Sequence, residues 1–66
     1  MTTIQRAIAL AAEQNISMYR LAQISDVAYS TLQTAVKRDS DLSFDVISRV
    51  CRALGITVAE FFSVFT

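Results

Sequence analysis

The chain contains no histidine, proline or tryptophan, and it has one cysteine and one glycine. The missing histidine excludes histidine-based acid–base catalysis and the usual catalytic triads. Cys51 alone can form neither an internal disulfide nor a cysteine-rich metal site. Gly55 alone cannot build a glycine-rich phosphate loop, which needs several glycines at fixed spacing. We therefore expect no enzyme and no bound cofactor or metal.

Long apolar runs are also missing, although 53% of the 66 residues are hydrophobic. A membrane-spanning helix needs about 18 consecutive apolar residues, and the N-terminal residues show no signal-peptide pattern. We therefore expect a cytoplasmic protein without a membrane anchor. Its length predicts one small domain that covers residues 1–66.

Neither sign of charge is in excess, because six lysine and arginine residues balance six aspartate and glutamate residues. Domains that bind nucleic acid are usually basic, so a net charge of zero argues against DNA binding on composition alone. The positions of the charges must decide the question.

Abundant alanine and leucine, with few helix-breaking residues, predict an all-α fold. Apolar residues recur at helical spacing along most of the chain, and they are interrupted by short polar stretches. The polar segment 37–43 is expected to be a loop. The expected helices cover residues 4–12, 18–25, 28–37 and 44–54, followed by a short fifth helix that opens at Thr57.

Polar residues stand where these helices should begin and end. Thr2 with Gln5, and Thr57 with Glu60, have the spacing of capping boxes. Single N-cap candidates and a left-handed C-cap candidate complete the set. The N-caps are Ser17 and Ser43, and the C-cap is Gly55.

The fourth expected helix carries both core residues and charges. Cys51 falls in its apolar stripe, which predicts a core residue rather than a redox switch. Arg49 and Arg52 are expected to be solvated or paired with Asp45, which lies on the same face.

The two helices around Asp26 have the lengths and the short turn of a helix-turn-helix. Ala22 allows the two helices to approach closely, and the third helix is expected to bury Leu32, Ala35 and Val36. Its opposite face then carries side chains that donate and accept hydrogen bonds, and a helix of this width fits the major groove of DNA. These side chains are Tyr29, Ser30, Gln33 and Thr34.

Four segments resemble the Cro/lambda-repressor-like helix-turn-helix family, also called the XRE family, in order and spacing. They are Ser17-Met-Tyr-Arg-Leu-Ala22, then Val27 with Tyr29-Ser-Thr-Leu32, then Ser43-Phe-Asp-Val-Ile47, and Ala53-Leu-Gly-Ile-Thr-Val-Ala-Glu-Phe-Phe62. The resemblance implies a compact five-helix bundle whose third helix reads double-stranded DNA. It also implies a transcriptional regulator, usually a dimeric repressor.

The resemblance assigns roles to particular residues. It implies that Tyr29, Ser30, Gln33 and Thr34 contact base edges, and Gln33 is the best candidate because an amide can bond bidentately to adenine. The residues it places against the phosphate backbone are Met18, Arg20, Thr31, Lys37 and Arg38.

Several residues depart from the family pattern. Asp26 holds a turn position where the family usually has glycine, and Ala28 stands where serine or threonine normally caps the third helix. Asp39 and Asp41 place negative charge in a loop that is expected to approach phosphate. These departures predict modest DNA affinity for a single subunit.

The C-terminal segment has more large apolar side chains than a bundle of this size can cover. One ring should close the core, and the surplus predicts a partner surface. We expect a homodimer that binds a pseudo-palindromic site, with no evident small-molecule effector. The predicted interface consists of Phe61, Phe62, Val64 and Phe65.

The same residues permit another interpretation, in which the fold serves as a protein–protein interaction module such as an antirepressor. Neutral charge, the missing cap at Ala28 and the surplus aromatic residues all favour it. Individual site residues also have a purely structural interpretation, Tyr29 as a half-buried surface aromatic and Lys37 and Arg38 as a solvated helix end. Steep salt dependence of DNA binding would distinguish the two functions.

Overall fold

The chain folds into helices throughout the region that the computed structural model describes, residues 1–65. This confirms the all-α prediction and the position of each expected helix, within one or two residues at the ends. A short 3₁₀ helix, η1, extends the fifth helix. The elements are α1 (Thr3–Glu13), α2 (Met18–Ser25), α3 (Tyr29–Arg38), α4 (Phe44–Leu54), α5 (Val58–Phe62) and η1 (Ser63–Phe65).

Side-chain caps begin four of these helices, as predicted. Thr2, Ser17, Ser43 and Thr57 each accept a hydrogen bond from the backbone N–H three residues later. At Thr2 the capping box is complete, because the Gln5 side chain also accepts from the Thr2 N–H. At Thr57 the predicted box is half formed: the Thr57 hydroxyl accepts from the Glu60 N–H, without the reciprocal bond from the Thr57 N–H to the Glu60 side chain. These bonds satisfy N–H groups that a helix leaves unpaired at its start.

Four helices end in the same way, with one residue in the left-handed region. These residues have φ between 48° and 70°, and only one of them is glycine. In each case the N–H of the next residue donates to the carbonyl five positions earlier at 2.9 or 3.0 Å, as in a Schellman motif. The chain therefore turns sharply at Asn15, Asp26, Asp39 and Gly55.

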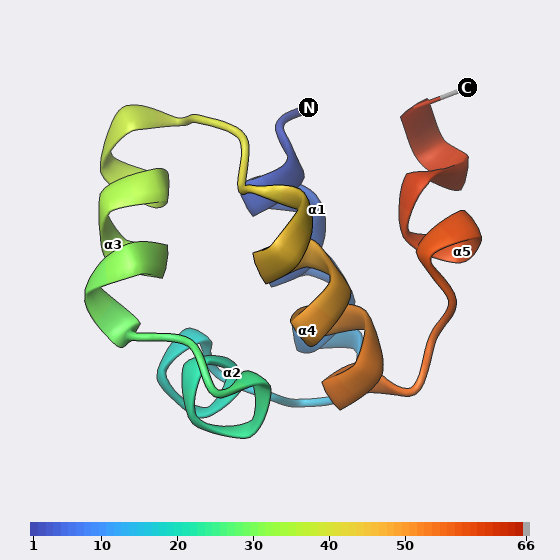
Figure 1. Cartoon of the computed structure of the whole chain (residues 1–66), viewed down its shortest axis with the longest axis horizontal. Helices are drawn as coiled ribbons and strands as arrows, with labels where there is room; N and C mark the ends of the chain where they lie inside the picture. The colour runs from blue at the N-terminus through green and yellow to red at the C-terminus, as the bar shows by residue number, and fades with distance from the viewer. Residues whose placement is uncertain (66) are drawn as a thin grey trace.

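The core lies where α1 and α4 cross the middle of the molecule (Figure 1). In this view α3 stands on the left and α5 on the right, at opposite ends of the longest axis, while α2 packs beneath α3. Phe61 is completely buried and closes the core from α5, beside large side chains from the other helices. The other fully buried large residues are Ile4, Leu21, Leu32 and Val50.

One burial prediction is wrong, and one core residue lies where a polar loop was expected. Val36 is 44% exposed, because it lies at the edge of the apolar stripe of α3. Leu42, in the segment expected to be a polar loop, is buried with the core. It is held there by its N–H, which donates to the buried Oγ1 of Thr3 at 2.6 Å.

Cys51 is buried in α4, as predicted for a core residue. Desolvation in the core raises the pKa of its thiol, which keeps the side chain neutral and poorly nucleophilic.

Long-range bonds fasten α5 to the bundle. Arg6 of α1 donates from Nε to the carbonyl of Phe61 at 2.9 Å and from Nη2 to the carbonyl of Glu60 at 3.0 Å. Gln14 donates to the carbonyl of Leu54 at 2.9 Å, at the end of α4. No helix among residues 1–65 combines the length and hydropathy that a membrane crossing requires.

Candidate nucleic-acid interface

The exposed face of α3 carries three of the four predicted base-contacting residues. Ser30, Gln33 and Thr34 are exposed, as is Thr31, whereas Leu32 on the opposite face is completely buried. The helix therefore divides cleanly between core and solvent, as its period of 3.6 residues dictates. Its outer face presents hydroxyl and amide groups that can both donate and accept hydrogen bonds.

Tyr29 occupies a different environment from the other three. Its side chain is half-buried and packs against the core. Its ring also meets the ring of Tyr19, on α2, edge to face, with centroids 5.3 Å apart and planes inclined by 77°. Tyr19 is 56% exposed, so the pair stands at the surface where the first turns of α2 and α3 meet.

The start of α3 has no side-chain cap. Ala28 has the extended backbone of an N-cap residue, with φ −60° and ψ 133°, but it supplies no hydrogen-bonding side chain. The departure from the family pattern noted in the sequence is thus present in the structure. The other four α-helices all begin with a capping hydroxyl.

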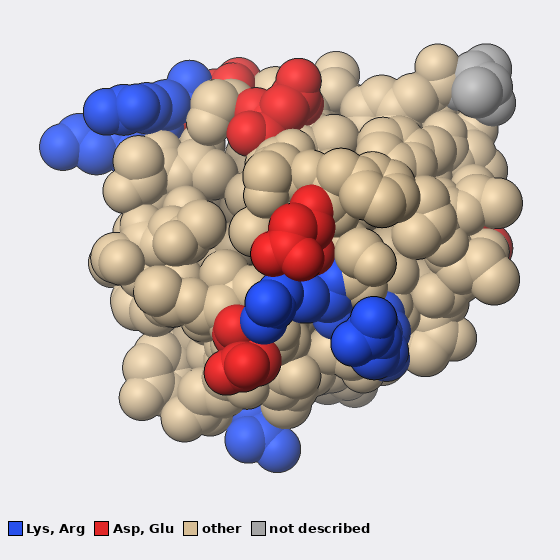
Figure 2. All heavy atoms as spheres, in the orientation of Figure 1, with Lys and Arg blue, Asp and Glu red and all other residues tan. Residues whose placement is uncertain are grey.

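Basic side chains gather where α3 ends. Lys37 and Arg38 lie in its last turn, both exposed, and neither forms an ion pair with a described residue. Figure 2 shows basic side chains projecting from this corner of the molecule, at the upper left. Arg20 on α2 is also exposed, and its guanidinium donates to Gln23 Oε1 at 3.4 Å.

Met18 is half-buried against the core, so its side chain is not free for a polar contact. It is the first residue of α2, directly after the Ser17 cap. Backbone N–H groups in the first turn of a helix attract anions, so any phosphate contact here must come from the backbone.

Asp39 and Asp41 are both bonded to the N-terminus of α1. Asp39 Oδ1 accepts from Thr2 Oγ1 at 3.2 Å and from Gln5 Nε2 at 2.8 Å. Asp41 Oδ1 accepts from the backbone N–H of Thr3 at 3.0 Å. The positive end of the α1 dipole stabilises carboxylates at this position. The two carboxylates are therefore held at the start of α1.

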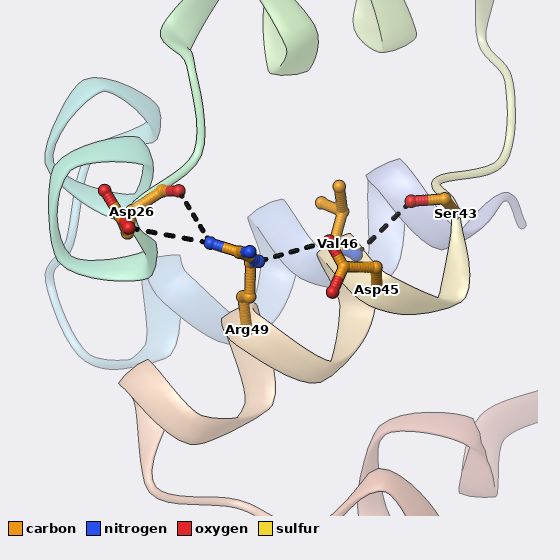
Figure 3. Close-up of polar contacts among 5 residues, drawn as sticks. All are labelled: Asp26, Ser43, Asp45, Val46 and Arg49. Carbon is orange, nitrogen blue, oxygen red and sulfur yellow. Dashed lines mark hydrogen bonds and ion pairs between the residues drawn. The ribbon is translucent and has the colours of Figure 1, made fainter.

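A further charged cluster fixes the turn between α2 and α3 (Figure 3). Arg49 of α4 donates to the backbone carbonyl of Asp26 at 3.2 Å, and its guanidinium lies 3.6 Å from the Asp26 carboxylate. The same side chain pairs with Asp45 at 3.2 Å, which confirms that predicted pair. The contact with Asp26 was not predicted, and it holds the turn whose left-handed residue replaces glycine.

These charges line a hollow between α2 and α4, on the face shown at the centre of Figure 2. Arginines and aspartates alternate there, so the hollow has no excess of either sign. The residues that line it are Ile24, Ser25, Asp26, Asp45, Ser48, Arg49, Arg52 and Ala53.

At the other end of the molecule, α5 and η1 expose part of the predicted dimer surface. Val64 is 51% exposed and Phe65 is 40% exposed, while Phe62 is half-buried. The Phe62 and Phe65 rings lie 5.9 Å apart. Phe61, in contrast, has no exposed surface, so its prediction as an interface residue is wrong.

The arrangement of α2 and α3 defines a helix-turn-helix protein: two short helices, a tight turn, and a second helix with a polar outer face. Comparison with known protein families matches residues 8–66 to the Cro/C1-type HTH DNA-binding domain. The chain belongs to this family, which confirms the resemblance noted in the sequence. It is therefore a DNA-binding domain of a regulator, with double-stranded DNA as its partner. Searches of curated proteins and of solved structures found no match.

Proposed function

We propose that the protein is a transcriptional repressor that binds operator DNA as a homodimer and inserts α3 into the major groove. The observation that carries this proposal is the outer face of α3, which is exposed, polar and followed by two unpaired cations within residues 1–65. Residues 1–66 act as one domain in this function.

Base recognition falls to the outer face of α3. Gln33 can bond bidentately to N6 and N7 of adenine through its amide. Hydroxyl groups on the same face can bond to several bases, and so they adjust specificity rather than dictate it. The proposed base-contacting residues are Tyr29, Ser30, Gln33 and Thr34.

Phosphate contacts flank this face on both sides. Lys37 and Arg38 would neutralise phosphates beyond the end of α3, and Arg20 would do so from α2. The α2 N-terminus at Met18 offers backbone N–H groups, and Thr31 offers a hydroxyl. Each neutralised phosphate releases counterions and steepens the salt dependence of binding.

A homodimer supplies the affinity that a neutral subunit lacks. Phe62, Val64 and Phe65 provide an apolar surface at α5 and η1, on the opposite side of the molecule from α3 (Figure 1). Two copies related by a two-fold axis can place an α3 in successive major grooves, about 34 Å apart. The operator should then be a pseudo-palindrome.

Selection of random duplex DNA by the purified protein would test the proposal, followed by gel shifts of variants on the selected site. Gln33→Ala should weaken binding to that site by about 1–3 kcal/mol and relax specificity at one position. Lys37→Ala should weaken all sequences alike and reduce the salt slope by about one.

Arg52→Ala is the matched control for Lys37→Ala. Arg52 is an exposed cation without an ion pair among the described residues, but it lies on α4, away from α3. If Lys37→Ala and Gln33→Ala both behaved like the parent, the assignment of α3 as the reading helix would be lost.

A second candidate, a protein-binding module on the same fold, is supported by the neutral charge and by Phe44, which is 65% exposed. It predicts no measurable binding to random duplex DNA even at low salt. The repressor predicts binding that falls steeply as salt rises.

A further inference from the structure

The first turn of α3 lacks a side-chain cap. A hydroxyl at the N-cap would bond to a free N–H and fix the direction in which the helix starts. Ala28 has no side-chain hydroxyl or carbonyl to do this, and the Thr31 N–H donates to the Ala28 backbone carbonyl at 3.0 Å. This is also the turn that carries Tyr29 and Ser30, which are proposed to meet the bases.

The Tyr29 ring makes two contacts at this turn. Tyr29 is the first residue of α3, and its side chain packs against the core and contacts the ring of Tyr19. At 5.3 Å and 77° the two rings have the edge-to-face geometry that aromatic pairs prefer. An aromatic contact between α2 and α3 thus lies next to the N-cap position, where the other α-helices of this chain have a capping hydroxyl.

We propose that Tyr19 is a positioning residue for DNA recognition, which holds Tyr29 and the first turn of α3 in the orientation that reads bases. The proposal rests on the function proposed above, and it assigns Tyr19 no contact with a base. Because Tyr19 is 56% exposed, its ring contributes little to the core. Its loss should therefore loosen the start of α3 without unfolding the protein.

Two substitutions separate the ring from the hydroxyl. Tyr19→Ala removes the contact and should weaken binding to the selected operator about threefold to tenfold, the range expected for one aromatic pair. Binding to random duplex should change less than twofold, since Thr31 is the single proposed phosphate contact that lies in the first turn of α3. Tyr19→Phe keeps the ring and should retain the parent's affinity for both.

Rescue tests the positioning role directly. Ala28→Ser introduces the missing cap, so Tyr19→Ala combined with Ala28→Ser should recover most of the lost operator affinity. Amide hydrogen exchange in the free protein should show faster exchange in the first turn of α3 for Tyr19→Ala. The double variant should return those rates toward the parent values.

The outcomes distinguish this proposal from the proposed function. If the parent binds its operator but Tyr19→Ala changes neither operator affinity nor amide exchange, Tyr19 does not position α3. If Tyr19→Phe loses affinity for operator and random DNA equally, the hydroxyl contacts phosphate and the positioning role is overturned. If the parent shows no sequence preference at all, the proposed function itself fails, whatever the exchange rates show.

Discussion

Single residues with left-handed backbone conformation end four helices of this fold. Asn15, Asp26 and Asp39 adopt φ values of 60°, 56° and 48°, which L-residues adopt only at a cost. Asp26 and Asp39 are compensated by contacts of their side chains, with Arg49 and with the α1 N-terminus. Among the described residues no comparable side-chain contact holds Asn15. The backbone strain at Asn15 is therefore not offset, and a substitution that relieves it should raise the stability of the protein.

Asn15→Gly is therefore expected to stabilise the protein by about 0.5–1 kcal/mol, because glycine adopts this conformation without a steric penalty. Gly55→Ala should do the opposite and cost about 1–2 kcal/mol. A Cβ at position 55 would meet no atom within 4 Å, so the loss would come from the backbone alone. Urea denaturation measures both, and a destabilised Asn15→Gly variant would refute the argument.

At the scale of elements, the segment between α3 and α4 is fastened to the start of α1. Asp39 and Asp41 accept hydrogen bonds from Thr2, Thr3 and Gln5, and Leu42 donates to Thr3. These bonds fix the path of the chain directly after the last turn of α3, and so they fix where Lys37 and Arg38 stand. The carboxylates that oppose DNA binding in the sequence are structural in the fold.

Asp39→Asn separates these two effects, because an amide oxygen can still accept from Thr2 and Gln5 while the negative charge is gone. It should tighten binding to all DNA sequences about twofold at low salt, as expected for removing one solvated charge near phosphate. The free energy of unfolding should change by no more than about 0.5 kcal/mol. Filter binding to random duplex over a salt series measures the first effect.

The control is Asp41→Ala, which removes the acceptor for the Thr3 N–H and should cost about 1 kcal/mol of stability. Weaker DNA binding by Asp39→Asn would show that the charge, rather than the hydrogen bonds, holds this segment in place.

Elements also show where sequence reasoning succeeds and where it stops. The sequence predicts the caps at Ser17 and Ser43, the turn at Asp26 and the left-handed C-cap at Gly55, because each signal lies within a few residues. The hydrogen bonds to Asp39 come from Gln5 and Thr2, which precede it by 34 and 37 positions in the sequence. Hydrophobic periodicity carries no information over such a separation. The Tyr19–Tyr29 contact could not be predicted for the same reason, since helical periodicity does not show which aromatic rings on neighbouring helices will meet across a turn.

The net charge of zero is a sum over the whole molecule, and it combines charges that are paired within the fold with charges that are free at the surface. Arg49 is paired with two aspartates and Arg6 is bonded to α5 carbonyls, so both are occupied within the fold. Lys37, Arg38 and Arg20 have no ion pair among residues 1–65 and lie on the helix-turn-helix. The charge available to DNA is therefore more positive than the composition suggests, though still modest for one subunit.

Dimerisation is the step that would make this modest charge sufficient. The spacing of about 34 Å between successive major grooves exceeds the 28 Å longest extent of the molecule, so one subunit cannot span it. In a dimer joined at α5 the two α3 helices would lie at the far ends, because α3 is at the opposite end of that axis from α5 (Figure 1), and an angle between the two long axes would bring them to the groove spacing. Linked half-sites then gain affinity from effective concentration rather than from new contacts.

Phe65→Ser should therefore weaken the dimer and operator binding together. Full burial of a large apolar side chain is worth about 1.5–3 kcal/mol. Phe65 is 40% exposed, so a dimer can bury only that part of each of its two copies, and the dimer dissociation constant should rise about tenfold to fiftyfold. Phe44→Ser, at an exposed phenylalanine on α4, is the matched control and should leave association unchanged. Sedimentation velocity across micromolar concentrations measures the effect. If the parent sediments only as a monomer but binds a palindromic site cooperatively, the subunits associate only when they are bound to DNA. If Phe65→Ser and Phe44→Ser weaken association equally, the interface does not lie at η1.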